Sequence, residues 1–271
     1  MIYKSFLPAP PLREFVRNYT IIHFQFKSGE PIPNKQRSPK AEQKIVFYIK
    51  DSPTLYGVDK TQTPAPVSIF NHQLDKKKIQ MPAEFFAFII FFQPGALHKL
   101  IRLPMMELVY EICDAEIFFG SAVRDVRDQL AQATSHQEMI SIVEQFLNRE
   151  CKKLLSSNSI DNIALHLMAD PTSFSLDEIA KQACLSTKQF YRRFTERIGM
   201  SPKLFSRLSR FNRAYQYKIA NPTFSWSSIA QEFCYTDYHH LEKEFKEFTS
   251  LTPQQVTDTH LSAPERILKL R

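Results

Sequence analysis

The sequence predicts an α+β fold with a β-rich first half and an all-helical second half. Most of the 17 prolines lie before residue 105, where they separate short apolar runs as in a small β-sandwich or barrel. Beyond Pro104 the apolar residues recur at the helical period of 3.6. From about residue 160 the chain repeats itself at a spacing of about fifty residues. Since 271 residues suffice for two domains of about 150, we expect domains at 1–158 and 159–271.

The first half contains the strand signals. Residues 20–27 alternate apolar and polar side chains, which is the period of a strand with one buried face. Apolar runs at 45–49, 67–70 and 85–92 predict further strands. The last run is the longest, and its eight residues fall short of the roughly 20 that cross a membrane, so no membrane span is expected.

Two helices are expected to close the first half. Apolar residues recur at helical spacing from Met106 to Ile117, and again from Ile140 to Leu154. The chain then becomes small and polar at 156–159, which predicts a joint between the two domains.

Neither catalysis nor a cofactor is expected. The five glycines are too far apart to form a phosphate-binding loop, and no G-x-S-x-G motif is present. No His-x-His precedes residue 160, so His23, His72, His98 and His136 stand alone and predict no metal site. The scattered cysteines and the lack of an export signal predict a cytoplasmic protein. We therefore assign no catalytic residue, no metal ligand and no cofactor.

The duplication in the second half predicts two helix-turn-helix units. Ile179 and Cys184 recur as Ile229 and Cys234 at an offset of 50, whereas Phe194 recurs as Phe245 at an offset of 51. One residue is therefore inserted within the second copy, which indicates two helices joined by a turn of adjustable length. We expect the units at about 175–199 and 225–250, joined by a linker helix at 203–220.

The second helix of each unit offers one face for reading DNA. In the first unit, the face opposite Phe190 and Phe194 predicts three base-reading residues: Lys188, Tyr191 and Arg192. In the second unit, the face opposite Leu241 and Phe245 offers His239, Glu242 and Lys243 as base-reading residues, with Tyr238 at its margin. Residues at the start or flank of these helices are expected to contact phosphates: Ser186, Arg193, Arg197 and Lys246.

The charge distribution favours double-stranded DNA as the partner. The net charge of +7 is modest, but residues 181–218 contain ten basic residues against one acid, Glu196. Arginine and lysine can donate to guanine O6 and N7, and glutamate can accept from cytosine N4. The competing interpretation of Arg207, Arg210 and Arg213 is an ordinary solvated helix face.

The segment FSLDEIAKQACLSTKQFYRRF, followed by GMSPKLF and IAQEFCYTDYHHLEKEFKEFTSLTPQQV, resembles the AraC/XylS family of bacterial transcription regulators. The resemblance implies a seven-helix DNA-binding domain whose two recognition helices enter successive major grooves. The stretches FLPAPPLREFVRNY and FFQPGALHKLIRLP resemble the sensor regions of the same family, and imply a cupin-like β-fold with helices that serve dimerisation. Cys234 and Ser250 stand where the family usually has glycine.

The sequence thus predicts a sequence-specific transcription regulator, with activation favoured by the family resemblance alone. The resemblance also implies a small-molecule effector in the first domain, a homodimer and contact with RNA polymerase. The alternative is a small-molecule sensor module, or a degenerate cupin enzyme, in which DNA binding is secondary.

Overall fold

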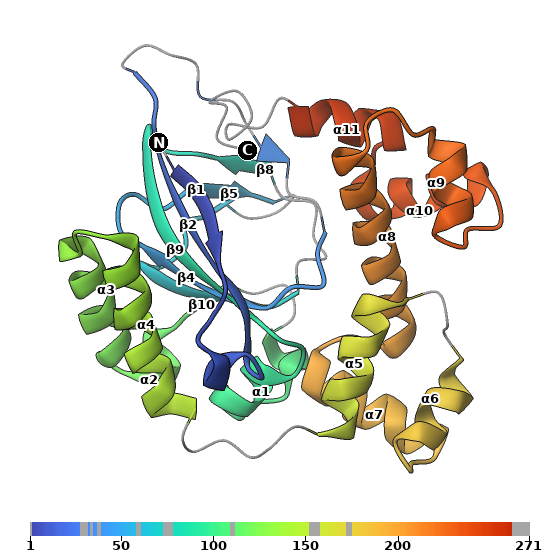
Figure 1. Cartoon of the computed structure of the whole chain (residues 1–271), viewed down its shortest axis with the longest axis horizontal. Coiled ribbons are helices and arrows are strands. Elements are labelled where there is room, and N and C mark those ends of the chain that lie inside the picture. Colours follow the sequence, from blue (N-terminus) through green and yellow to red (C-terminus); the bar gives the residue numbers. More distant parts are fainter. Residues whose placement is uncertain are drawn as a thin grey trace.

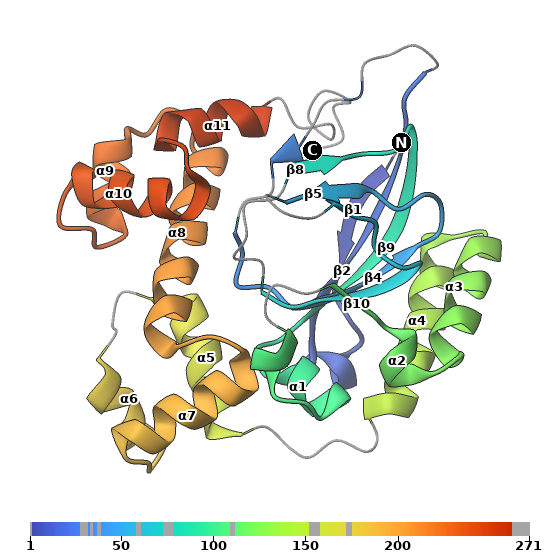
Figure 2. The ribbon, with the colours of Figure 1, turned by 180° about the vertical axis from the view of Figure 1, so that it is seen from behind.

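The structure is a computed structural model that describes residues 2–27, 32, 35–36, 39–57, 61–72, 78–108, 112–151, 158–171 and 175–261. A β-rich half lies beside a helical half, as Figure 1 and the opposite view in Figure 2 show. The predicted fold class is confirmed. Residues 156–157 of the expected joint, together with the tail beyond 261, lie outside the described residues.

The β-rich half is built from two antiparallel sheets. The larger has the order β1-β2-β9-β4-β7-β10 and the smaller the order β3-β8-β5-β6. The strands are β1 (Ile2–Phe6), β2 (Val16–Gln25), β3 (Lys35–Gln36), β4 (Lys44–Tyr48), β5 (Thr54–Tyr56), β6 (Thr61–Gln62), β7 (Val67–Phe70), β8 (Lys78–Gln80), β9 (Glu84–Phe92) and β10 (Ile112–Asp114).

The long apolar run forms β9 because that strand is buried on both faces. Phe88 and Ile90 point to a core that the sheet shares with helices, whereas Phe85 and Ile89 belong to a second apolar cluster with Leu55 of β5. Alternate residues of an extended chain point to opposite faces, so two buried faces require a continuous apolar sequence.

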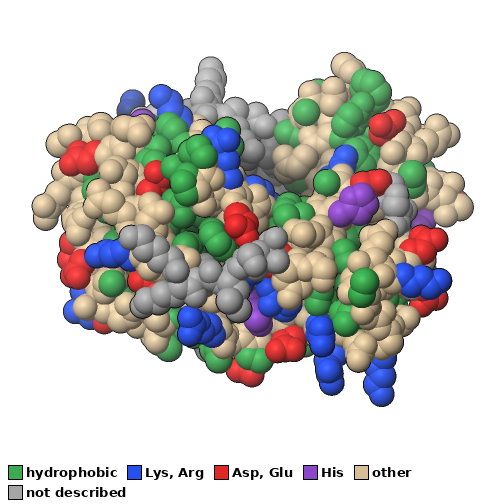
Figure 3. Space-filling view, turned by 60° about the horizontal axis from the view of Figure 1, so that its bottom comes forward, with side chains coloured by type: hydrophobic (Ala, Val, Ile, Leu, Met, Phe, Trp, Pro, Cys, Tyr) green, Lys and Arg blue, Asp and Glu red, His purple; other side chains and the backbone are tan. Residues whose placement is uncertain are grey.

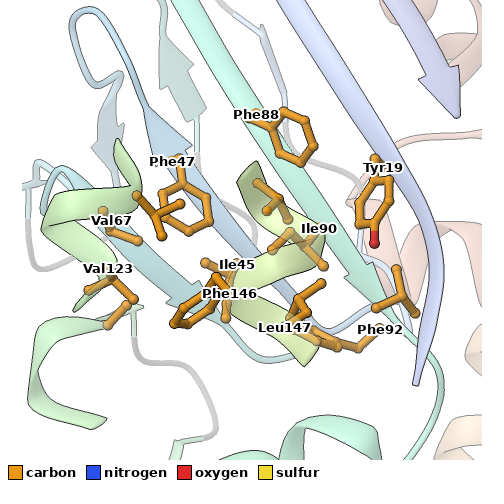
Figure 4. Close-up of a cluster of buried hydrophobic side chains, with 14 of the residues drawn as sticks. Tyr19, Ile45, Phe47, Val67, Phe88, Ile90, Phe92, Val123, Phe146 and Leu147 are labelled. Carbon is orange, nitrogen blue, oxygen red and sulfur yellow. The ribbon is translucent and has the colours of Figure 1, made fainter. Parts of the chain in front are cut away.

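The described part of the β-rich half also contains four α-helices: α1 (Ala96–Ile101), α2 (Glu116–Phe119), α3 (Ala122–Gln132) and α4 (His136–Cys151). Figure 4 shows Val123 of α3 and Phe146 and Leu147 of α4 packed against strand residues such as Ile45 and Phe47. The core of this half therefore lies between the larger sheet and the α3–α4 pair.

The predicted helix from Met106 to Ile117 is wrong. Met105–Leu108 forms a single 3-10 turn, and Ile112–Asp114 forms strand β10, which pairs antiparallel with β7. The edge of β7 offers unpaired backbone groups, and pairing with them outweighs the local helical period. Strand β1, which pairs with β2, gave no alternating signal in the sequence.

The described part of the helical half contains seven helices: α5 (Ser159–Ala169), α6 (Leu176–Gln182), α7 (Thr187–Ile198), α8 (Pro202–Ala220), α9 (Trp226–Glu232), α10 (Tyr238–Thr249) and α11 (Pro253–Leu261). One apolar cluster runs through all seven, from Ile160 to Val256. It contains no residue of the core that joins the larger sheet to α3 and α4.

The helices repeat as the duplication predicts. The α6–α7 pair lies at one end of α8 and the α9–α10 pair at the other (Figures 1 and 2). Helices α6 and α9 are offset by 50 residues, and α7 and α10 by 51. The inserted residue is therefore in the turn of the second unit, where it leaves the lengths of both helices unchanged.

Candidate nucleic-acid interface

Both helix-turn-helix units turn through the same backbone motif. In the first, Cys184 N–H donates to the Lys181 carbonyl and Leu185 N–H to the Ala180 carbonyl, at 2.9 and 3.0 Å. In the second, Cys234 and Tyr235 make the equivalent bonds, at 3.1 and 2.9 Å. This pattern is a Schellman motif, in which the residue after the helix takes a left-handed conformation.

The residues that replace the usual glycines keep the glycine conformation. Cys234 has a φ of 54° and Ser250 a φ of 62°, both in the left-handed region, and Cys184 has a φ of 55°. A side chain in this region costs about 1–2 kcal/mol. The turns therefore carry some strain, but the second unit keeps the same plan as the first.

Side chains cap the start of each second helix. Ser186 and Gln189 form a complete capping box at α7, and Asp237 accepts from His240 N–H at 2.7 Å at the start of α10. Ser186, expected at a phosphate, thus lies at the positive end of the α7 dipole, where backbone N–H groups favour an anion.

The predicted reading residues of α7 are available to a ligand. The side chains of Lys188, Tyr191 and Arg192 are exposed, as is that of Arg193. Tyr191 keeps 48% of its surface exposed, so its ring and hydroxyl are open to a ligand. Figure 3 shows lysine and arginine side chains projecting from the helical half on the right of the view.

The predicted residues of α10 are partly engaged with one another. His239 and Lys243 are exposed, whereas Tyr238 is half-buried against the helical core. The half-buried Glu242 pairs with the exposed Lys246 one turn later, at 3.2 Å. Such pairs contribute little to stability, so the pair does not prevent either side chain from meeting DNA.

Arg197 does not occupy the position expected of a phosphate contact. Its Nε and Nη2 donate to the two carboxylate oxygens of Asp161 in α5, at 2.9 and 2.8 Å. Asp161 is 3% exposed, and Lys99 of α1 reaches its Oδ2 at 3.1 Å from the β-rich half. Gly95 lies against this carboxylate, where a Cβ atom would clash. We therefore correct the expectation for Arg197, because its guanidinium is held in a buried ion cluster between the two halves.

The C-terminal end of α7 is also held by the β-rich half. The carbonyl oxygen of Ile198 accepts from His72 Nε2 at 2.6 Å and from Gln43 Nε2 at 3.4 Å. Gly199 follows with a φ of 91°, and a Cβ there would lie 3.0 Å from Asn71. Sequence reasoning had left His72 isolated, since its partner is a backbone atom 126 residues away.

Acidification is expected to destabilise this contact through His72. Burial lowers the pKa of His72 from 6.5 to about 4, although the bond to Ile198 and the charge of Glu42 favour its protonated form. The unfolded chain therefore binds a proton at higher pH than the folded chain. Through this residue alone, the free energy of unfolding should fall by about 3 kcal/mol as the pH drops from 6.5 to about 4, and no further below that.

Urea unfolding of the wild type and of His72→Gln, measured between pH 7 and pH 3.5, checks this prediction. Glutamine can donate to Ile198 but does not titrate. The two curves should diverge below pH 6.5, with the wild type losing more stability. Parallel curves would show that burial does not hold His72 neutral in the folded protein.

Part of the positive charge at residues 181–218 is neutralised by acidic side chains from other segments of the chain. Arg207 and Arg210 donate to the buried carboxylate of Glu244, just as Arg197 donates to Asp161. Arg213 of the same helix is exposed and lies over the Phe233 ring, at 5.9 Å. The interpretation of Arg207 and Arg210 as a solvated face is thus also wrong, because both contact buried groups.

Three further findings concern the described residues. None of their helices is both long and apolar enough to cross a membrane. They contain no group of three or more histidine, cysteine or acidic side chains that could hold a metal ion. Cys184 and Cys234 are exposed free cysteines, while Cys151 is buried.

Comparison with known proteins agrees with this geometry. A family described as "Helix-turn-helix domain" matches residues 179–259. An apo variant of ToxT from Vibrio cholerae strain SCE256 is similar in fold, with 12% identity, a TM-score of 0.52, and coverage of 89% of this chain and 97% of that one. No curated protein matches the sequence.

Two further structures are similar at lower TM-scores. Wild-type ToxT with a bound unsaturated fatty acid, from the same strain, has 12% identity and a TM-score of 0.49 over 88% of this chain and 94% of that one. A regulator with an AraC-type DNA-binding domain from Chromobacterium violaceum has 24% identity and a TM-score of 0.32, over 37% of this chain and 89% of that one.

The fold and the duplicated unit define a DNA-binding transcription regulator. Residues 179–259 form a helix-turn-helix domain of the AraC type, behind an N-terminal β-rich domain in a ToxT-like two-domain fold. The resemblance of this part of the chain to a helix-turn-helix domain of the AraC type is thereby confirmed.

Proposed function

We propose that the chain is a sequence-specific regulator that reads two successive major grooves with α7 and α10, and acts by binding rather than by catalysis. The observation that carries the proposal is the repeated unit, with one recognition helix at each end of α8. The 19 residues of α8 span about 28 Å at 1.5 Å per residue, which is close to the roughly 34 Å of one DNA turn.

Within this proposal the side chains divide into two roles. Lys188, Tyr191 and Arg192 of α7 read bases in one groove. The residues of α10 that read the next groove are Tyr238, His239, Glu242 and Lys243. Arg193 and Lys246 contact phosphates, together with the N-terminal end of α7 at Ser186. Arg197 is left out of the interface because Asp161 already holds it.

For the β-rich half we also propose roles that its fold alone does not show. We expect it to serve as a sensor domain that binds a small-molecule effector and supports a homodimer. Activation, with contact to RNA polymerase, remains a prediction of the family resemblance. A cytoplasmic location remains a prediction of the cysteine pattern.

A selection from random double-stranded DNA tests the proposed function. An enriched motif is the expected result. Equal binding to all sequences, with no enrichment over rounds, would contradict it.

Arg192→Ala and Arg193→Ala are expected to differ on the selected site. Losing Arg192 should cost about 1–3 kcal/mol of binding free energy and relax the preference at one base position, because a base contact is lost. Losing Arg193 should weaken all sequences alike and reduce the salt slope by about one. Titrations of the selected and a shuffled site at several salt concentrations distinguish the two, and identical profiles would contradict this division of roles.

A further inference from the structure

Glu244 is a buried carboxylate on the recognition helix of the second unit. It is 2% exposed and lies on the inner side of α10 with Leu241, Phe245 and Phe248. The proposed reading residues, by contrast, lie on the outer side. Burying a carboxylate at a core position costs free energy unless charged or polar groups form hydrogen bonds with it.

Three donors from two other segments converge on this carboxylate. Arg207 Nε and Arg210 Nη2, both on α8, donate to Oε2 at 2.9 and 3.0 Å. The hydroxyl of Tyr235, in the turn between α9 and α10, donates to Oε1 at 2.8 Å. Burial and the neighbouring Glu244 raise the pKa of Tyr235, which keeps this hydroxyl protonated.

The same donors are also held by aromatic rings. Arg210 lies over the Tyr235 ring at 4.2 Å, and Arg207 over the Phe248 ring at 5.3 Å. Arg207 additionally donates to the exposed Glu247 at 2.6 Å. The linker helix, the turn and the recognition helix of the second unit therefore meet at one carboxylate.

The first unit is attached to the linker helix in a different way. Its α7 contacts α8 through aromatic rings, with Phe194 and Phe205 at 5.7 Å, and its polar contacts go to Asp161, Gln43 and His72 instead. Apolar contacts permit small sliding movements, whereas a multiply bonded carboxylate is satisfied in only one arrangement. The hydrogen-bonded contact between α8 and α10 at Glu244 thus belongs to the second unit.

We propose that Glu244 is a positioning residue that fixes α10 against α8 and so sets the spacing at which the second recognition helix meets DNA. The predicted effect on DNA binding rests on the proposed function. The predicted effect on the distance between the two units does not. Glu244 itself does not touch DNA. Its removal changes the separation of the two half-sites that the protein accepts, and leaves the base preference within each half-site unchanged.

The structural test measures the separation of the two units without DNA. Spin labels on the exposed Cys184 and Cys234 report the distance between the two turns, with Cys113 and Cys151 replaced by serine and alanine. The distance distribution should be narrow in this background and in the control Glu247→Gln, which alters only an exposed partner of Arg207. It should broaden in Glu244→Gln. An unchanged distribution in Glu244→Gln would overturn the proposal, whatever the protein does with DNA.

The DNA test uses sites that differ only in the separation of the half-sites. The preference for the best separation over one changed by a base pair should fall about tenfold in Glu244→Gln, the size expected when a coupled hydrogen-bond network is lost. Glu247→Gln should keep the wild-type preference. If wild-type protein selects no motif, the proposed function fails while the distance measurement still decides the role of Glu244.

A second variant covers the case in which Glu244→Gln does not fold. The triple change Glu244→Leu, Arg210→Met and Tyr235→Phe removes the polar groups together, so that no buried charge is left unpaired. Arg207 keeps Glu247 as its partner. This variant should fold and show the broadened distance distribution, and a narrow distribution would overturn the proposal.

Discussion

Replacing Asp161 with alanine is expected to lower the free energy of unfolding by about 3–5 kcal/mol, because it leaves two buried cations without their partner. The side chains of Arg197 and Lys99 are only 16% and 10% exposed, so water cannot take the place of the carboxylate. Among the described residues, Lys99 would keep a distant ion pair with Glu14, at 4.0 Å, and its position over the Phe15 ring, at 5.6 Å. The loss should fall on the contact between the two halves, since Lys99 belongs to one and Arg197 to the other.

Urea unfolding of Asp161→Ala, followed by amide hydrogen exchange at α1 and α7, measures this effect. The matched control is Glu116→Ala, which removes the carboxylate of an exposed pair with Arg124. This change should leave the free energy of unfolding unchanged. Equal stability of Asp161→Ala and the wild type would show that the ion cluster does not hold the halves together.

Phe245→Ala is expected to cost about 3–5 kcal/mol by opening a cavity in the helical core. Phe245 is fully buried, and its ring lies 4.6 Å from Phe211 of α8 and 5.0 Å from Trp226 of α9. It therefore joins the linker helix α8 to both helices of the second unit. Because one apolar cluster runs through the whole helical half, the first unit should lose stability as well.

The control for this prediction is Phe224→Ala. Phe224 is 45% exposed, and its ring lies 5.5 Å from that of Tyr217, so its loss should cost less than about 1 kcal/mol. Amide hydrogen exchange in Phe245→Ala should become faster in α6 and α7 as well as in α9 and α10. Faster exchange that is confined to α9 and α10 would contradict a shared core.

The second half could be predicted more fully than the first because its signals are local. Caps such as Ser186 with Gln189, and the helical spacing of Phe190 and Phe194, place α7 without knowledge of distant residues. The duplication supplied a second, independent copy of the same pattern. The strand β10 shows the opposite case, because its partner β7 lies some forty residues away and the local period favours a helix.

The candidate site could be predicted where it faces solvent and not where it meets the rest of the protein. Lys188 and Arg192 are exposed as their helix position indicates. Arg197 shares their sequence pattern, yet its partner Asp161 lies 36 residues earlier on another helix. Helical spacing assigns a residue to a face, but it does not say which neighbouring element covers that face.

A selection from random DNA, run in parallel for wild-type protein, Arg192→Ala and Lys243→Ala, tests most directly whether α7 and α10 read two successive grooves. The account predicts a two-part motif with halves about 10–10.5 base pairs apart, in which Arg192→Ala relaxes one half and Lys243→Ala the other. A motif with a single half, or two variants that relax the same positions, would contradict it.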